Sequence, residues 1–222
     1  MLNKNKAVVL VSGGLDSAVL LYKLHRDGLD PIALSVNYNQ RHLKELDYAE
    51  RLCANLGVKH HIADLSEVGF CLKGGSQTDP AVAVPHGHYA DPSMKLTVVP
   101  NRNMIMLSLA TGLAISTERG IVAYAAHAGD HPIYPDCRPD FINALQSAME
   151  FAWYEPIQLL APFSSSTKAQ IVSLGESLEV PFADTWSCYE GGLVHCGTCG
   201  TCMERREAFY IADTKDPTEY RK

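Results

Sequence analysis

A serine- and glycine-rich string directly follows the first apolar run of the chain, at residues 7–11. Glycines let the backbone approach an anion closely, and the unpaired amides of a following helix carry the positive end of its dipole. Two serine hydroxyls add further hydrogen-bond donors. The string therefore predicts a phosphate-binding turn, and its residues are Ser12, Gly13, Gly14, Leu15, Asp16 and Ser17.

Asp16 would repel a phosphate unless a cation lay between them, so we expect Mg²⁺ to accompany the bound phosphate. A tight strand-to-helix turn capped by serine is the alternative interpretation of the string. Its context of apolar strand, loop and helix favours phosphate binding. The string is not the Gly-x-x-x-x-Gly-Lys-Ser/Thr loop, because no lysine follows the second glycine, and a dinucleotide fingerprint is also absent.

A second group of residues with chemical potential lies near the C-terminus, where four of the seven cysteines follow the spacing C-x7-C-x2-C-x2-C. Four thiolates at such spacing suit a closed tetrahedral Zn²⁺ site. A [4Fe–4S] cluster competes, because C-x2-C-x2-C partly resembles a ferredoxin run, and chance clustering of buried cysteines is a third possibility. Few large apolar residues surround them, so we expect the metal to fold this tail. We predict one structural zinc per chain, held by Cys188, Cys196, Cys199 and Cys202.

The elements that must position these groups alternate between strand and helix patterns. Continuous apolar runs predict strands at residues 7–11, 31–36, 58–65, 121–126 and 157–160. Three- and four-residue spacings of apolar residues predict helices at 18–25, 43–56, 104–116, 140–154, 167–178 and 203–212. The alternation indicates an α/β fold, a doubly wound and mostly parallel sheet with helices on both faces.

The chain is expected to divide near residue 180. Residues 1–180 would form the phosphate-binding α/β domain, and residues 181–222 would form a small zinc-binding tail. Periodicity fails over residues 66–97, where glycine, proline and aspartate punctuate a long loop region. Loops of this length are usually functional or disordered. We expect a substrate lid there, with a floppy insertion as the alternative, and a second substrate loop at residues 127–140.

The amino-acid composition limits the classes of protein to which this chain can belong. The chain has 222 residues, of which 46% are hydrophobic and 20% charged, as in one soluble domain of the larger sort. A formal net charge of −6 without a basic stripe argues against a long nucleic acid as the main partner. No apolar stretch approaches the ~20 residues of a membrane span, and the first apolar run is too short for a signal peptide. These features and an odd number of cysteines predict a cytoplasmic protein without a disulfide framework.

The string at residues 12–17 resembles the signature of the N-type ATP pyrophosphatases, the PP-loop enzymes. The resemblance implies an adenine nucleotide alpha hydrolase-like fold. It also implies a loop that holds the β- and γ-phosphates of ATP while a substrate oxygen attacks the α-phosphate. Ala18 would adjoin this ATP site, and Lys168, at the start of a later helix, would be a second phosphate contact. A solvated lysine on a helix is the alternative for Lys168.

Over essentially its whole length the chain resembles the 7-cyano-7-deazaguanine synthase family of queuosine-precursor biosynthesis. Besides the phosphate string and the four cysteines, the matching segments are residues 38–42 (YNQRH), 99–103 (VPNRN), 134–139 (YPDCRP) and 186–188 (WSC). Asn39 replaces a glycine of the family's first segment, and asparagine tolerates positive φ better than most residues. Residues 127–131 (HAGDH) also depart from the family pattern, which leaves the role of Asp130 open.

This resemblance implies that 7-carboxy-7-deazaguanine and ammonia become the nitrile through an adenylated acid and an adenylated amide, with release of AMP and pyrophosphate. It also implies a homodimer. Two loops, at residues 101–103 and 136–138, follow apolar segments at the sheet edge where ligands of open α/β folds bind. Arg102 or Arg138 would pair with the substrate carboxylate. Asp130 or Asp136 would accept hydrogen bonds from the guanine-like edge, with Asn101 nearby. Ordinary surface ion pairs are the alternative.

Two other functions stay open at this stage. A PP-loop tRNA-modifying ligase or thiolase would need an RNA-binding extension or a sulfur-carrying cysteine, and the chain is short and acidic. A nucleotide-sensing module that has lost turnover is disfavoured because the phosphate string and all four clustered cysteines are intact. Cys137 invites a thioester proposal, but a lone cysteine more often packs than reacts.

Overall fold

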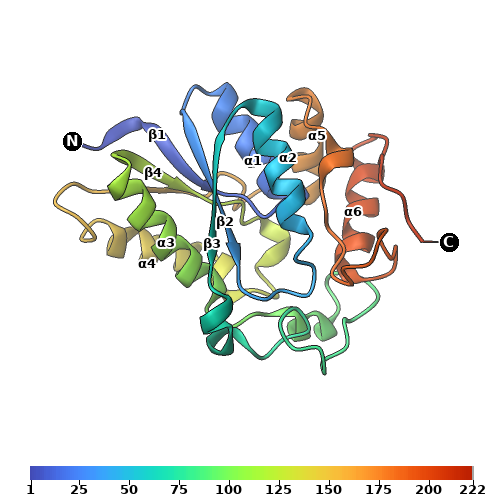
Figure 1. Cartoon of the computed structure of the whole chain (residues 1–222). Helices are drawn as coiled ribbons and strands as arrows, with labels where there is room; N and C mark the ends of the chain where they lie inside the picture. The colour runs from blue at the N-terminus through green and yellow to red at the C-terminus, as the bar shows by residue number, and fades with distance from the viewer. Residues whose placement is uncertain (222) are drawn as a thin grey trace.

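A five-stranded sheet lies at the centre of the computed structural model, which describes residues 1–221 (Figure 1). All strand pairs are parallel, and the strand order is β3-β2-β1-β4-β5. The strands are β1 (Asn3–Leu10), β2 (Pro31–Asn37), β3 (Lys59–Asp64), β4 (Arg119–Ala123) and β5 (Gln158–Leu160). The chain leaves β1 toward β2 on one side and later returns to β4 on the other. The order therefore reverses between β1 and β4.

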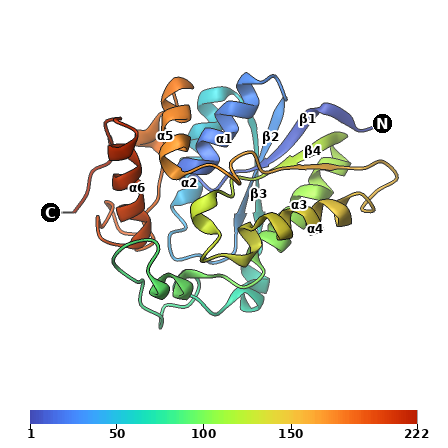
Figure 2. The same ribbon diagram turned by 180° about the vertical axis from the view of Figure 1, so that it is seen from behind.

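Helices cover both faces of this sheet (Figures 1 and 2). They are α1 (Leu15–Arg26), α2 (Glu45–Leu56), α3 (Arg102–Ser116), α4 (Pro139–Met149), α5 (Lys168–Ser177) and α6 (Gly200–Ile211). One buried cluster joins β1 to residues of α1, α2, α5 and α6, and a second joins the sheet to α3 and α4. The predicted doubly wound α/β fold is confirmed, and within residues 1–221 no helix has the length and apolar character needed to cross a bilayer.

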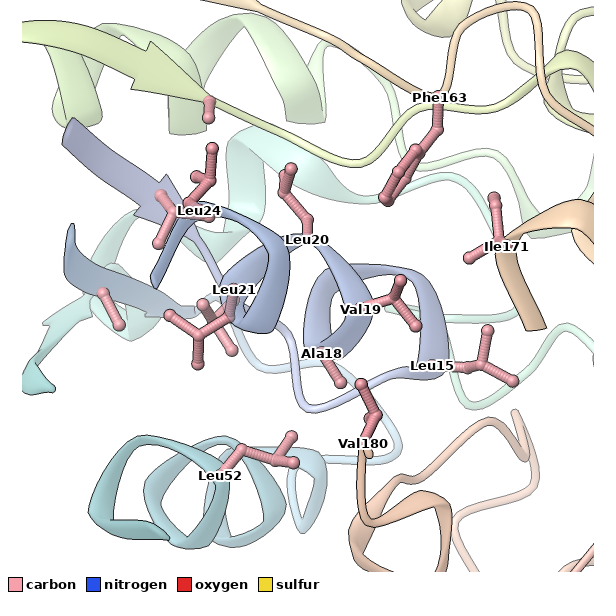
Figure 3. Packing of buried hydrophobic residues seen from close by; sticks show 14 of the residues in the cluster. Leu15, Ala18, Val19, Leu20, Leu21, Leu24, Leu52, Phe163, Ile171 and Val180 are labelled. Carbon is pink, nitrogen blue, oxygen red and sulfur yellow. The ribbon is translucent and has the colours of Figure 1, made fainter. Parts of the chain in front are cut away.

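Helix α1 is enclosed because its apolar residues are not confined to one stripe. Its buried residues are Leu15, Ser17, Ala18, Val19, Leu20, Leu21 and Leu24. Figure 3 shows Leu20 on the side of Phe163, with Leu52 of α2 on the opposite side of the helix. A helix packed on all sides cannot rotate or shift easily. The phosphate string at its N-terminus is therefore held by the core.

Gly13 fixes how the string packs. Its φ is 86°, and a Cβ at this position would lie 2.1 Å from the carbonyl oxygen of Glu45. Both the left-handed backbone and the close approach require glycine. The string therefore rests directly against the start of α2.

The predicted strands and helices are all present, with shifted ends. Helix α4 ends at Met149 rather than near residue 154, because Phe151 and Tyr154, which extended the apolar pattern, are exposed. Helix α6 begins at Gly200 rather than at residue 203, with Cys199 as its N-cap residue. The sequence pattern missed this start because the first turn of α6 lies inside the cysteine segment.

Residues 66–97 pack onto the tail of the chain. Two 3-10 helices, Ser66–Leu72 and Pro92–Thr97, bound the segment. Between them, His86 forms an antiparallel bridge with Cys199, and the Gly87 amide donates to the carbonyl of Thr198 at 3.0 Å. Met94 is fully buried. The segment thus links the cysteine region to the sheet edge.

The division of the chain near residue 180 stays a prediction. The residues beyond it are not a separate body in packing terms, because Phe182 and Phe209 belong to the same buried cluster as α1. Their rings meet edge to face with centroids 5.0 Å apart.

Candidate active site and metal centre

A cavity of about 230 Å³ opens at the carboxyl ends of β1, β2 and β4. Ligands of open α/β sheets bind at this edge, where the strand order reverses. The lining comes from segments that are distant in sequence: the residues directly after these strands, the first residues of α3 and α5, the start of α6, and Tyr89 of the 66–97 segment. The fold, rather than any single motif, therefore builds the site.

The phosphate string forms one side of the cavity. The Ser12 amide donates to Ser17 Oγ at 3.1 Å, and Ser17 Oγ donates to the Gly14 carbonyl at 3.0 Å. Gly14 precedes α1 without a side-chain cap, so the first amides of this helix are available to an anion. The string residues that line the cavity are Ser12, Gly14, Leu15, Asp16 and Ser17.

Two residues assigned to the ATP site by sequence do not line the cavity. Gly13 packs against α2, as described above, and Ala18 is fully buried in the core around α1. Both residues support the string on the side that faces away from the cavity.

Lys168 holds the phosphate side together by charge. Its Nζ lies 2.5 Å from Asp16 Oδ2 and 3.3 Å from Glu204 Oε2. Burial disfavours the Lys168 ammonium, but Asp16 and Glu204 outweigh it, so the pKa of Lys168 is raised. Burial also opposes ionisation of Asp16, yet the charge of Lys168 brings the pKa of Asp16 below its ordinary value. The prediction that Lys168 and the string lie together agrees with this placement.

The pKa of Glu204 shifts in the direction opposite to that of Asp16. Burial raises the pKa of Glu204 above its ordinary value, although Lys168 opposes the rise. Its side chain is 13% exposed and lines the cavity from α6. The site therefore contains a carboxylate that is costly to keep ionised when no further cation is present.

Asp130 is held at the centre of the cavity by two neighbours. Its Oδ1 accepts a hydrogen bond from the Tyr89 hydroxyl at 2.9 Å and lies 3.3 Å from His127 Nε2. His127 Nδ1 accepts from the Gly129 amide at 3.0 Å, and its Nε2 lies 3.1 Å from Lys168 Nζ. A Cβ at Gly129 would lie 2.8 Å from the His127 ring. The unusual residues 127–131 thus form a turn that fixes Asp130 as a cavity carboxylate.

Arg102 is the predicted arginine that reaches the cavity. Burial opposes its charge, but Tyr38, Tyr189 and Asp136 outweigh burial, so the pKa of Arg102 is raised. Its Nε donates to Asn103 Oδ1 at a long 3.4 Å. The Arg102 guanidinium therefore stays positively charged, and its hydrogen bond within the protein is weak.

The structure corrects the placement of three other predicted substrate residues, none of which lines the cavity. Asn101 is exposed with φ 59° and precedes α3. Arg138 is exposed, and its Nε donates to the His131 carbonyl at 2.8 Å. Asp136 Oδ2 accepts from the Asn103 amide at 3.1 Å, where a carboxylate stabilises the start of α3. Arg102 points into the cavity and these three residues do not. The sequence pattern of the loops could not predict the direction of a side chain.

Five tyrosines line the cavity, and three of them, Tyr89, Tyr124 and Tyr134, belong to the buried cluster with α3 and α4. The five are Tyr38, Tyr89, Tyr124, Tyr134 and Tyr189. Burial raises the pKa of Tyr38 to about 12, and burial raises that of the other four as well. All five phenols stay neutral at physiological pH. Flat rings with neutral hydroxyls suit a polar heteroaromatic ligand.

Cys137 also lines this tyrosine side. Burial raises the pKa of its thiol, and Asn103 Nδ2 lies 3.4 Å from its Sγ. The thiolate is the nucleophilic form of cysteine. Cys137 is therefore suited to packing rather than to attack, as expected from the sequence.

The four clustered cysteines form a metal-binding group. Their sulfur atoms all lie within 4.8 Å of one another, and all four residues are buried. The amides of Cys196 and Cys199 donate to the sulfurs of Cys188 and Cys196 at 3.3 and 3.2 Å. Hydrogen bonds from the Cys188 and Cys202 thiols lower the pKa of Cys199. Converging sulfurs with amide donors are the chemistry of a thiolate metal site.

The side chains around the four cysteines pack together more extensively than the sequence predicted. The rings of Trp186 and His195 lie 4.1 Å apart by their centroids, and Lys44 Nζ sits 3.8 Å from the Trp186 centroid. Arg205 is 1% exposed and donates to the Phe182 carbonyl, among other partners. The expectation that metal alone folds the tail is therefore too strong.

Comparison with known proteins decides the family. Residues 6–213 match the family model described as queuosine biosynthesis protein QueC. The chain belongs to the QueC family. It is 52% identical to the 7-cyano-7-deazaguanine synthase of Rhizobium leguminosarum bv. trifolii, over 97% of this chain and 92% of that protein. The 7-cyano-7-deazaguanine synthase of Ruegeria pomeroyi is 51% identical, over 97% and 94%. The predicted resemblance is confirmed.

Solved structures share the fold of this QueC chain at low identity. NMN synthetase from Francisella tularensis matches with a TM-score of 0.51 and 17% identity, over 96% of this chain and 79% of that one. The U34-tRNA thiolase NcsA from Methanococcus maripaludis, solved with its [4Fe-4S] cluster, matches with a TM-score of 0.50 and 16% identity, over 96% and 67%. These likenesses concern the fold alone.

Several cavity residues of this QueC chain escaped the sequence analysis. Tyr38, Tyr134 and Trp186 lie in segments that carried the family resemblance, so a role could have been suspected. Glu204 and Tyr89 had no such signal. They reach the cavity only because α6 and the 66–97 segment fold back onto the sheet edge.

Glu204→Gln tests the charge balance of the phosphate side. Because the pKa of Glu204 is raised in the folded protein, its contribution to stability is present at low pH and is lost as pH rises through the folded pKa. The variant should therefore melt higher than wild type at pH 7 in the absence of nucleotide, and the gap should close near pH 4. Thermal unfolding across pH measures this.

Glu207→Gln on the same helix is the matched control. Glu207 is 52% exposed and pairs with the exposed His88, so its loss should change the melting temperature little at either pH. A Glu204→Gln variant that melts lower than wild type at pH 7 would show that the Lys168 pair outweighs burial.

Proposed function

We propose that this chain is a 7-cyano-7-deazaguanine synthase, an ATP-dependent carbon–nitrogen ligase that makes a nitrile for queuosine biosynthesis. Membership of the QueC family and the printed names of its relatives support this proposal. One structural observation carries it. A single cavity joins an anion-binding string and a buried lysine to a recess of neutral tyrosines with Arg102.

The ATP triphosphate is assigned to the string side. Ser12, Ser17 and the first amides of α1 donate to phosphate oxygens, and Lys168 offsets their charge. Asp16 Oδ1 is buried without a hydrogen-bond partner among residues 1–221. An orphaned carboxylate oxygen beside Glu204 fits Mg²⁺, which takes one or two carboxylates together with substrate phosphates. When bound, Mg²⁺ would neutralise phosphate charge, with Asp16 and Glu204 as its protein ligands.

The 7-carboxy-7-deazaguanine ring is assigned to the tyrosine side. Arg102 pairs with its carboxylate as a charge-assisted contact, and Asp130 accepts from the ring N–H groups. The arrangement holds an oxygen of the carboxylate toward the α-phosphate of ATP. Positioning and charge compensation are most of what an adenylation requires of a protein.

The reaction then follows in two rounds. The carboxylate oxygen attacks the α-phosphate and pyrophosphate leaves, which gives the adenylated acid. Ammonia attacks the acyl carbon and AMP leaves, which gives the amide. The amide oxygen attacks a second ATP, and loss of AMP with a proton from nitrogen leaves the nitrile. Two ATP become two AMP and two pyrophosphate.

We assign Zn²⁺ to the four cysteines as a structural ion. A tetrahedral ion with metal–sulfur bonds of about 2.3 Å separates its sulfurs by about 3.8 Å. Cys196 Sγ and Cys202 Sγ lie 3.9 Å apart, and no pair of the four exceeds 4.8 Å. A [4Fe–4S] cluster would need wider spacing, because four irons must fit between the thiolates. The closed set of four ligands leaves no open position for catalysis.

The remaining partners are part of the same proposal. Free ammonia is the nitrogen donor, and the chain acts as a homodimer on a small molecule rather than on nucleic acid. Four cysteines kept as metal-bound thiolates suit the reducing cytoplasm.

Product analysis tests the function. Purified protein with 7-carboxy-7-deazaguanine, ammonium, ATP and magnesium should give the nitrile with two AMP for each nitrile formed. Omitting ammonium should stop nitrile formation. Asp16→Asn should lower turnover at least tenfold, because the amide removes the negative charge that pairs with Lys168 and that would hold Mg²⁺. ADP as the nucleotide product would contradict the adenylation.

Metal analysis tests the tail. The purified protein should be colourless and contain about one zinc per chain. Cys196→Ser should lose that zinc, because one of four ligands is removed, whereas Cys71→Ser should retain it because Cys71 is exposed and distant from the group. Iron with acid-labile sulfide and visible absorbance would contradict the assignment.

A further inference from the structure

Tyr124 directly follows β4, at the point where the strand order reverses. Its side chain is only 4% exposed and lines the cavity. Its hydroxyl is buried without a hydrogen-bond partner among residues 1–221. A buried hydroxyl without a partner destabilises a folded protein, so such groups call for a functional explanation.

Three neighbouring tyrosines of the cavity, Tyr89, Tyr134 and Tyr189, have internal hydrogen-bond partners. The Tyr89 hydroxyl donates to Asp130 Oδ1 at 2.9 Å. The Tyr134 hydroxyl lies 2.6 Å from Thr97 Oγ1 and 3.2 Å from the Tyr189 hydroxyl. Tyr124 differs from these three in that its buried hydroxyl has no partner among residues 1–221 and can serve a ligand.

The place of Tyr124 indicates which part of a ligand it meets. Its ring belongs to the buried cluster over α3 and α4, with Tyr134 and Cys137. The string side, with Leu15 and α5, belongs to the cluster on the other face of the sheet. Tyr124 thus faces the recess away from the phosphate chemistry, where the ring of the substrate would lie.

The electrostatics indicate the direction of the hydrogen bond. Burial raises the pKa of Tyr124, and the negative charges of Asp136 and Asp130 add to the rise. The phenol therefore keeps its proton and can donate it. A guanine-like edge carries two N–H donors beside one carbonyl acceptor, so it matches a carboxylate placed next to a phenol.

We propose that the Tyr124 hydroxyl donates a hydrogen bond to the ring carbonyl oxygen of the deazaguanine substrate, beside the Asp130 carboxylate that accepts from the ring N–H groups. This inference rests on the proposed function and names a specificity-determining residue for it. An adenine-like ring presents an amino donor where the carbonyl would be. Tyr124 can rotate its proton away from such a donor, but it then forfeits the contact that selects the carbonyl.

Tyr124→Phe tests the inference by binding. Calorimetry with α,β-methylene ATP present should show about tenfold weaker binding of 7-carboxy-7-deazaguanine to the variant, the loss expected for one neutral hydrogen bond. A ligand that lacks the ring carbonyl, and with it the adjacent ring N–H, is 2-amino-7-deazapurine-7-carboxylate; it should bind wild type more than tenfold more weakly than the natural acid, because the Asp130 contact is lost as well. It should bind the variant and wild type equally.

Stability provides an independent readout. Tyr124→Phe removes an unpartnered hydroxyl, so the ligand-free variant should melt at or above the wild-type temperature. Tyr134→Phe removes a bonded hydroxyl and should melt lower. Tyr210→Phe, with its ring 86% exposed, should leave binding and melting unchanged.

The outcomes separate the two proposals. Equal binding of the acid by wild type and Tyr124→Phe, or an equal loss for both ligands, overturns the role of Tyr124 alone. A wild-type chain that binds neither ligand and releases no AMP overturns the proposed function, and the inference with it.

Discussion

The buried pair of Lys168 and Asp16 is the interaction on which the site depends. It joins the first residue of α5 to the first turn of α1 across the sheet edge. Glu204 adds a second carboxylate from α6, so the three helices meet at one ammonium group. A lysine buried without these partners would lose its proton or unfold the site. Under the proposed function, the same lysine becomes available to nucleotide phosphate when a divalent cation occupies the carboxylates.

The tail and the 66–97 segment follow from this arrangement. The four cysteines gather at the start of α6, and Glu204 lies one turn further along that helix. The bridge between His86 and Cys199 brings the segment that carries Tyr89 over the cavity. The four-cysteine group thus lies outside the cavity and acts through packing. It sets the direction of α6 and supports the segment that orders Asp130.

Local patterns were enough for the elements and for the string, because an apolar strand and a helix start are read within a few residues. Lys168 was identified through the family resemblance. The loops at 101–103 and 136–138 were located correctly at the sheet edge, but only Arg102 of the predicted residues there points into the cavity. Side-chain direction depends on the rotation of α3 and on the short turns around it. Tyr124 and Glu204 depend on how distant elements pack, which no local pattern contains.

In the proposed reaction, one phosphate string serves two successive attacks by oxygens of the same carboxylate. Substrate labelled with ¹⁸O on both carboxylate oxygens tests it directly, by mass spectrometry of the released nucleotide. The account predicts that every AMP carries one ¹⁸O and that the nitrile carries none, because the first oxygen leaves with the first AMP and the second with the second. Unlabelled AMP, or label recovered in pyrophosphate, phosphate or water, would contradict it.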